Sequence, residues 1–403
     1  MLKLQMLPAV CGDCLWLEYG DPQKAHIVII DGGLRETADI LRARIESACR
    51  ERSTTTLEVE LLVVTHYDND HILGIIELLE HMPSSLHVKE VWFNGRPQLM
   101  RMPKPPARLK RRSQRPADLM GGDEDEENGE LEFPSNFDAL PSPADLLGPQ
   151  EADELSGLLT KNGLPWNKHT PWRGEAIVVP DTGRLPSLSL AEGLRLTLLG
   201  PTPTLLYKLC TAWADVLGGQ DEWGAEQEGG PADLLGRRDT WPPVWKNGEQ
   251  RDTSAANGSS IMLLAEYGDH ALLLAGDGHA RDLATGVERL RRERNQAKGL
   301  PIAAFKVPHH GSAKNLSRSV LEQIDCSRYL ISTDGSAHGH PDHQALLRIL
   351  RYSSRPPRLM FNYESDTTRP WRDSKSDVVG EGFQDYDTTF PESAAEGLVI
   401  ELE

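Results

Sequence analysis

The chain has 403 residues, 38% of them hydrophobic and 26% charged, which is the composition of a soluble globular protein. Its formal net charge of −18 argues against a surface that grips nucleic acid by charge alone, although bound divalent cations would reverse the sign locally. No apolar stretch approaches the ~20 residues needed to span a bilayer, residues 1–20 lack a signal-peptide cleavage site, and the five cysteines are scattered, so we expect a cytoplasmic protein with reduced thiols and no membrane partner.

The first part of the chain alternates between strand and helix patterns, which predicts an α/β fold. The first helix has its apolar residues on one face, and the third strand is a continuous apolar run typical of a buried strand. The predicted elements are strands at 14–18 and 26–30, a helix over 36–49, a strand at 57–64 and a helix that starts near residue 71.

Two segments lose this periodicity and are predicted to be largely irregular insertions, at 96–193 and 218–256. The first begins with a basic stretch, 96–115, and continues with an acidic one, 123–130. These halves can neutralise each other, or the basic part can contact a phosphate chain. Covering a cleft and binding a protein partner are equally open roles for the two insertions.

The second half of the chain returns to the α/β pattern and includes a hairpin around the turn at Gly268-Asp269. We therefore expect one domain, 1–403, interrupted by the two insertions. The predicted elements are strands at 194–199, 260–267, 271–275, 302–307, 328–332 and 358–362, with helices over 281–298 and after residue 341.

The most informative segment is the run HYDNDH at residues 66–71, between a predicted strand and a predicted helix. Four of its side chains can bind a divalent cation, which needs imidazole or carboxylate groups converging within roughly 2.0–2.2 Å. A lone aspartate here would be a helix N-cap, but four ligand-type residues favour a metal-binding loop. Asp277 and the pair His309-His310 also follow predicted strands, at the edge where open α/β sheets place their sites.

These residues resemble the metallo-β-lactamase superfamily, and the likeness runs over most of the chain. The chain is most similar to the lactamase-like domain of competence-type DNA-uptake channel proteins, and choline-phosphate esterases look similar around the same loops. The run at 66–71 matches the family's HxHxDH loop, with Asp68 in place of the middle histidine. The resemblance implies a four-layer αββα sandwich with two long insertions. Supporting segments are Gly12-Asp13-Cys14, NGSS at 257–260, GDG at 276–278, KVPHHGS at 306–312 and HGHP at 338–341.

The resemblance also implies two divalent metal ions, zinc in the first place and manganese as an alternative. Asp31 matches an aspartate that braces the metal loop, and Asp277 matches the carboxylate that bridges both cations. The family's usual third histidine has no clear counterpart, although His169 could supply a ligand. The implied ligands are His66, Asp68 and Asp277 for the first cation, and Asp70, His71, Asp277 and one of the histidine pair, His310 by preference, for the second.

Two cations about 3.5–4 Å apart share a water whose pKa falls toward ~7, which gives a metal-bridging hydroxide as the nucleophile. Asp70 is the ligand whose loss should abolish turnover. His309 or His340 could bind the phosphate or protonate the leaving oxygen. The remaining candidates for substrate contact are Ser312, Lys314 and His338, of which Ser312 has a helix N-cap as its alternative role.

Three functions are compatible with these residues. The first is a metal-dependent phosphodiesterase or nuclease, with a nucleic acid or a nucleotide as substrate, and the second is a hydrolase of another ester, lactone or thioester. The third is a metal-binding regulatory or scaffold module without turnover, against which the complete ligand set weighs. Cys11 and Cys14 form a CxxC that we interpret as two buried strand residues, with a structural metal site or a redox pair as the alternative.

Overall fold

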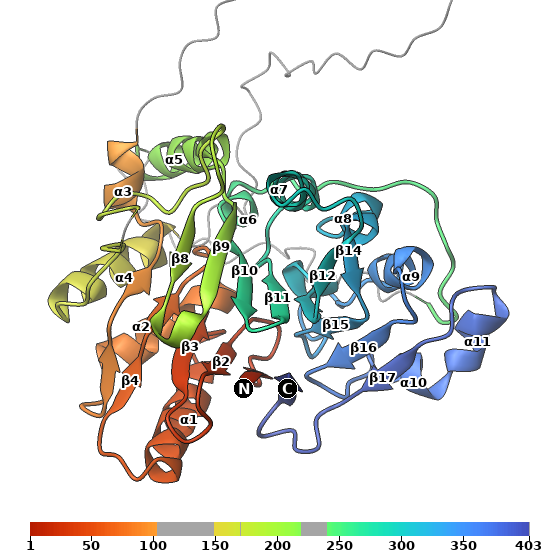
Figure 1. The fold of residues 1–403 in the computed structure, drawn as a ribbon, viewed down its shortest axis with the longest axis horizontal. Helices are drawn as coiled ribbons and strands as arrows, with labels where there is room; N and C mark the ends of the chain where they lie inside the picture. The colour runs from red at the N-terminus through yellow and green to blue at the C-terminus, as the bar shows by residue number, and fades with distance from the viewer. Residues whose placement is uncertain (103–148, 170, 219–239, 403) are drawn as a thin grey trace, which may run out of the picture.

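The computed structural model describes residues 1–102, 149–169, 171–218 and 240–402 (Figure 1). Two large β-sheets with helices beside them form a mixed α/β fold, which confirms the α/β prediction. Within the described ranges, no helix is both long enough and apolar enough to cross a membrane.

The first sheet has six strands in the order β18-β1-β2-β3-β5-β7. Antiparallel pairing joins β18, β1, β2 and β3, and parallel pairing joins β3, β5 and β7. The strands are β1 (Leu2–Met6), β2 (Leu15–Tyr19), β3 (His26–Ile30), β5 (Leu61–Val63), β7 (Val91–Trp92) and β18 (Leu398–Leu402).

The second sheet has eight strands in the order β17-β16-β15-β13-β11-β10-β9-β8. Strands β8 to β11 pair antiparallel, and the sheet continues in parallel from β11 through β13, β15 and β16 to β17. The strands are β8 (Ser187–Ser189), β9 (Arg195–Gly200), β10 (Met262–Tyr267), β11 (His270–Leu274), β13 (Ala304–Lys306), β15 (Arg328–Ile331), β16 (Arg358–Phe361) and β17 (Asp387–Thr389).

Helices and two short parallel ladders, β4–β6 and β12–β14, complete the fold. The ladders are formed by β4 (Leu57–Val59), β6 (Leu86–Val88), β12 (Leu300–Ile302) and β14 (Ile324–Cys326). The helices are α1 (Thr37–Glu51), α2 (Asn69–Glu80), α3 (Arg96–Arg101), α4 (Pro149–Lys161), α5 (Pro203–Gly218), α6 (Ala255–Gly258), α7 (Ala280–Glu293), α8 (Arg318–Gln323), α9 (His343–Tyr352), α10 (Pro370–Asp373) and α11 (Lys375–Gly380).

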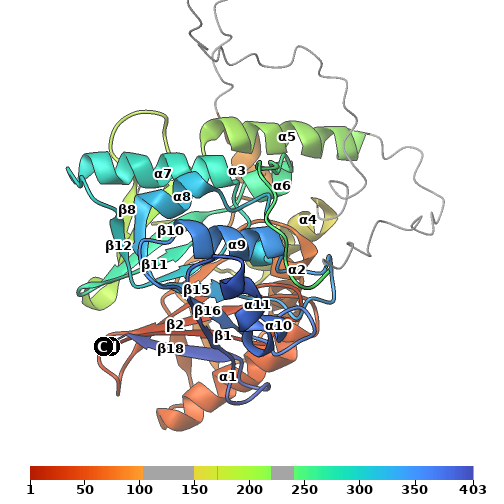
Figure 2. The ribbon, with the colours of Figure 1, turned by 90° about the vertical axis from the view of Figure 1, so that its right-hand side faces the viewer.

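Alternate residues of the first sheet enter two different cores. In β3, Val28 and Ile30 join a core shared with the second sheet, whereas Ile27 and Ile29 join a core that contains the apolar faces of α1 and α2. This follows from the period of two with which side chains alternate along a strand. Buried residues of α7, α8 and α9 pack in the same core as the second sheet, and these helices lie along it in Figures 1 and 2.

Some elements differ from the sequence predictions. The strand predicted at 57–64 is divided at Glu60 into β4 and β5, and the buried Glu60 carboxylate accepts a hydrogen bond from Lys89 at 2.8 Å. The range 96–193, predicted to be largely irregular, contains α3, α4 and β8. Helix α4 packs Leu155 and Leu159 into the core beside α2. These two leucines have helical spacing, but the neighbouring prolines and charges obscured this pattern in the sequence. In the second predicted insertion, residues 240–254 contain no helix or strand, and most of the basic stretch and all of the acidic one lie outside the described residues.

Candidate metal centre

Asp31 holds the loop that follows β5. Asp31 comes directly after β3 and has a left-handed backbone conformation, with φ of 58°. Its carboxylate accepts hydrogen bonds from the backbone nitrogen and the hydroxyl of Thr65, both at 2.7 Å. The same carboxylate accepts from His71 Nδ1 at 2.9 Å, so in the neutral imidazole Nε2 is the nitrogen that carries the lone pair. This is how carboxylates orient histidine ligands in metal sites.

The second sheet brings Asp277 and the histidine pair to the same place. Strands β11 and β13 are parallel neighbours, so the loops that follow them leave the sheet at one edge. Both histidines have positive φ, 49° for His309 and 54° for His310, which turns both side chains back toward the edge. Asp277 Oδ2 consequently lies within 4 Å of four imidazole nitrogens, at 3.2 Å from His71 Nε2, 3.5 Å from His310 Nε2, 3.8 Å from His309 Nε2 and 3.9 Å from His66 Nε2.

Two further carboxylates complete the cluster. Asp70 Oδ2 lies 3.1 Å from His310 Nε2 and 3.9 Å from His71 Nε2, and Asp68 Oδ2 lies 3.5 Å from His66 Nε2. Four groups of described side chains have ligand atoms close enough together to hold a cation, and two of them make up this cluster: His66, His71 and Asp277, and Asp70, His71 and His310. A third, Asp13, Asp31 and His71, lies directly behind the cluster, and the fourth, Glu77, Glu80 and His81, is at the exposed end of α2. The six residues implied as ligands by the resemblance are therefore gathered in one place.

The inward-facing atoms of this cluster lack hydrogen-bond partners. His66 Nε2, His71 Nε2, His310 Nε2 and Asp277 Oδ1 are all buried and make no hydrogen bond. Buried polar atoms in folded proteins nearly always have a partner, so four such atoms around one point need an explanation. Imidazole nitrogens and carboxylate oxygens are the donors that zinc and manganese accept, so a bound cation fits this set.

The charges of the cluster are complementary. Burial by itself would lower the pKa values of His71 and His310, but the nearby carboxylates, above all Asp277, raise both well above the ordinary range. Burial would likewise raise the pKa values of Asp277 and Asp70, but His71 and His310 hold both carboxyl groups below their usual range. Protons on the imidazoles balance the carboxylates here, and a divalent cation that binds would displace them.

His309 belongs to the cluster as well as His310. His309 Nδ1 donates to Asn315 Oδ1 at 2.9 Å, which leaves Nε2 free on the side of Asp277. The Asn315 amide is fixed in turn, because its nitrogen donates to Asp252 Oδ2 at 2.7 Å and to Asp277 O at 3.0 Å. Sequence reasoning missed Asp252 and Asn315, since single polar residues in loops carry no pattern that marks them.

The predicted substrate-contact residues lie beside the cluster with different surroundings. The rings of His340 and His338 are 6.0 Å apart, and the ring of His340 is 5.6 Å from that of His309. Burial lowers the pKa of His340, which disfavours the protonated form that a general acid needs. Ser312 is buried, and its hydroxyl accepts a hydrogen bond from the backbone nitrogen of Lys314 at 3.3 Å, so this side chain stabilises the local turn. The Lys314 side chain is exposed. The helix N-cap considered for Ser312 is provided by Ser317, whose hydroxyl accepts from Val320 N.

Two other sequence candidates lie apart from this chemistry. His169 is beside Glu90, with Nδ1 3.8 Å from its carboxylate, and belongs to none of the metal-ligating groups found among the described residues. Both cysteines of the CxxC are free thiols in the loop before β2, and only Cys14 is buried. Burial is the largest cause that raises the pKa of Cys11 to about 11, so at neutral pH this residue is a thiol and not the thiolate that binds metals.

No known family model matches the chain, and a search of curated proteins found no significant match.

Proposed function

We propose that this protein is a binuclear metal-dependent hydrolase with the four-layer αββα sandwich of the metallo-β-lactamase fold, and that its substrates are phosphodiesters. The position of Asp277 Oδ2, within 4 Å of four imidazole nitrogens contributed by both sheets, is the observation that carries this proposal. The packing of helices against the outer face of each sheet supports the proposed layers.

The ligands divide into two sets that share Asp277. His66 and Asp68 would hold the first cation, with His309 in the place of the third histidine that the sequence lacks. Asp70, His71 and His310 would hold the second. The mixture of imidazole and carboxylate groups suits zinc and also admits manganese.

Bound cations would supply an activated water and would neutralise the negative charge that grows in the transition state. The residues of the chain hold the other parts of the reaction in place. Asp31 and Asn315 fix the imidazoles of His71 and His309 by accepting hydrogen bonds from their Nδ1 atoms. The two rings therefore need not reorient during the reaction. Since His340 is held neutral and next to His309, it is suited to donating a hydrogen bond to a substrate oxygen and not to giving up a full proton.

A phosphodiester is favoured over a neutral ester because it gains most from paired cations. Its transition state carries negative charge on several oxygens, which two adjacent cations would neutralise together. Lactone or thioester hydrolysis by the same residues is the second candidate, and a metal-binding module without turnover is the third.

The test is hydrolysis of bis-p-nitrophenyl phosphate with zinc or manganese, beside a lactone and a thioester. Asp70→Ala should abolish phosphodiester turnover, whereas Asp269→Ala, in the exposed turn between β10 and β11, should leave it unchanged. Activity on the lactone alone would replace the phosphodiester with the second candidate. Cations bound without turnover of any of these substrates would favour the third.

A further inference from the structure

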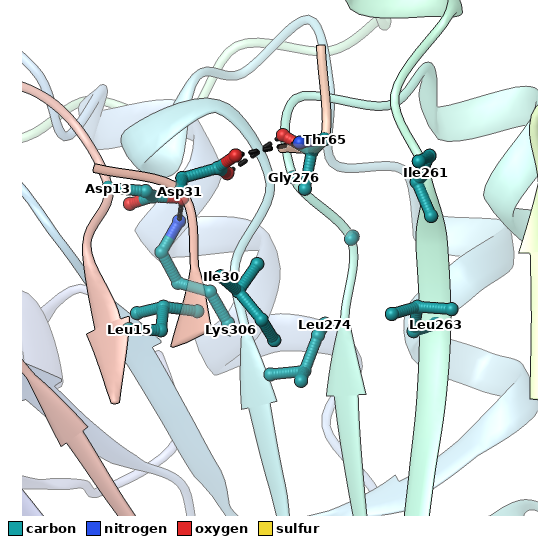
Figure 3. A pocket seen from close by; sticks show the side chains of 11 residues that line it. Asp13, Leu15, Ile30, Asp31, Thr65, Ile261, Leu263, Leu274, Gly276 and Lys306 are labelled. Atoms are coloured by element: carbon teal, nitrogen blue, oxygen red, sulfur yellow. Dashed lines mark hydrogen bonds and ion pairs between the residues drawn. The ribbon is translucent and has the colours of Figure 1, made fainter. Parts of the chain in front are cut away.

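A buried ion pair lies behind the ligand cluster. Lys306 Nζ is 2.6 Å from Asp13 Oδ2, and both side chains are only 1% exposed (Figure 3). Lys306 is the last residue of β13, within an otherwise apolar strand, and Asp13 lies in the loop before β2. A lysine is almost never buried to this extent unless it is paired, so the burial of Lys306 depends on Asp13.

Asp13 also contacts the two second-set ligands that Asp31 does not hold. Its Oδ1 makes no hydrogen bond and lies 3.5 Å from His310 Nδ1, which itself donates to Ser332 O at 2.9 Å. The backbone nitrogen of Asp13 donates to Asp70 O at 3.2 Å, a contact that does not involve the Asp13 side chain. The preceding residue approaches just as closely, because a Cβ added to Gly12 would lie 1.9 Å from Asp70 O. The loop before β2 therefore touches Asp70 and His310, whereas Asp31 is bonded to His71.

The two carboxylates lie on one small cavity between the sheets. Asp13, Asp31 and Thr65 line its polar end, and Figure 3 shows Lys306 reaching up to Asp13 from the strand below. Lys306 is the single cationic side chain among the residues that line this cavity. In surroundings of low dielectric constant, its charge compensates a carboxylate that would otherwise add to the three of the cluster, Asp68, Asp70 and Asp277, and to Asp31 behind them.

We propose that Asp13 and Lys306 form a positioning pair for the second cation. The Asp13 carboxylate would hold the His310 imidazole electrostatically, beside the Ser332 carbonyl that accepts its Nδ1 hydrogen bond, and Lys306 would hold that carboxylate in place. This inference rests on the proposed binuclear centre. An ion pair that served only the stability of the fold would not need a carboxylate oxygen beside the imidazole of a ligand.

Three variants separate positioning from stability. Asp13→Asn and Lys306→Met each leave one buried charge unpaired, so both are expected to destabilise the fold. The double variant Asp13→Asn/Lys306→Met removes both charges and should recover stability, because a buried pair is often replaceable by uncharged groups of similar size. All three variants should lower the affinity for the second cation by about 10- to 100-fold and leave the affinity for the first cation unchanged. Losing a residue that positions a metal ligand typically has an effect of this size.

The control is a nearly buried ion pair that joins α1 to β2 of the first sheet, where Glu18 also contacts Arg52 at 3.2 Å. Arg44 lies 3.0 Å from Glu18, and their side chains are 12% and 8% exposed. Arg44→Met should lower the unfolding temperature without changing the affinity for either cation.

The measurements use the full chain with Zn²⁺ or Mn²⁺ alone. Metal content per chain and competition with a chromophoric chelator give two dissociation constants, and the absorption spectrum of the Co²⁺ form reports the geometry of each cation. Two cations in the wild type and a selective loss of the second in the double variant support the inference. Wild-type affinities in the double variant, or an equal loss of both cations, overturn it. Fewer than two cations in the wild type would refute the proposed centre itself, and the inference with it.

Discussion

Replacing Asp31 with asparagine should weaken the binding of the second cation, because it should move the proton of the His71 imidazole from one ring nitrogen to the other. Asparagine tolerates the left-handed backbone of residue 31, so the loop need not move. Asp31 accepts three hydrogen bonds, two from Thr65 and one from His71 Nδ1. Asparagine offers one oxygen and one NH₂ group, so an N–H must face either Thr65 or His71.

The consequence for His71 sets the size of the effect. With an N–H opposite it, His71 Nδ1 becomes the acceptor and the proton moves to Nε2, the atom that lies 3.2 Å from Asp277 Oδ2. A protonated Nε2 cannot bind a cation. We expect the second cation to bind about 10- to 100-fold more weakly, which corresponds to about 1.4–2.7 kcal/mol.

Competition titration with Zn²⁺ measures this change, and ¹⁵N chemical shifts of the imidazoles in the metal-free protein, recorded at a pH high enough for His71 to be neutral, report the position of the proton. The control is Asp39→Asn on α1, whose side chain is 86% exposed. Unchanged zinc affinity together with a reversed His71 tautomer would refute the reasoning that the tautomer controls binding.

Three other predictions concern the shared carboxylate, the cations and the packing. Asp277→Ala should remove both cations from the isolated protein and lower phosphodiester turnover by at least about 10²-fold. A chelator should lower the unfolding temperature, because a cation held at 100 times its dissociation constant stabilises the fold by about 2.7 kcal/mol. Gly74→Ala should destabilise by about 1–3 kcal/mol, since its Cβ would lie 1.9 Å from Gly32 O, whereas Gly157→Ala in open space on α4 should stabilise by about 0.5–1 kcal/mol.

Each of these has a result that contradicts it. Two cations retained in the Asp277 variant, measured by elemental analysis, would remove that residue from the centre. An unfolding temperature that is the same with zinc and with a chelator would mean that no cation binds the folded state. Equal free energies of unfolding for the two glycine variants in urea would show that the contact between Gly74 and Gly32 yields without cost.

The ligand-type residues of the loop at 66–71 were easy to find because they are adjacent in the sequence. The run at 66–71 places four ligand-type residues between a strand and a helix, and Asp277 and His310 each follow a strand. Strand ends of a parallel sheet meet at one edge, which predicts that Asp277 and His310 lie together after β11 and β13. Their approach to the run at 66–71, which belongs to the other sheet, was implied by the family resemblance.

The supporting residues were not predictable in the same way. Asp13 and Lys306 are 293 positions apart, and Asp252 and Asn315 are 63 apart, so their pairing depends on how the two sheets pack. One signal was present, since Lys306 interrupts an apolar strand and a buried lysine requires a partner. Helix α4 was missed because its apolar face is short and lies next to a segment rich in prolines and charges.

The pairing of β1 with β18 has a consequence for how the molecule is made. Leu2 lies opposite Leu402 and Met6 opposite Leu398, so one side of β1 has no partner until residues 398–402 have left the ribosome. An unpaired strand edge is a template for association between nascent chains. Lys3 lies 3.3 Å from Glu401 once the last strand has docked. Before that, its charge on the unpaired strand discourages association between chains.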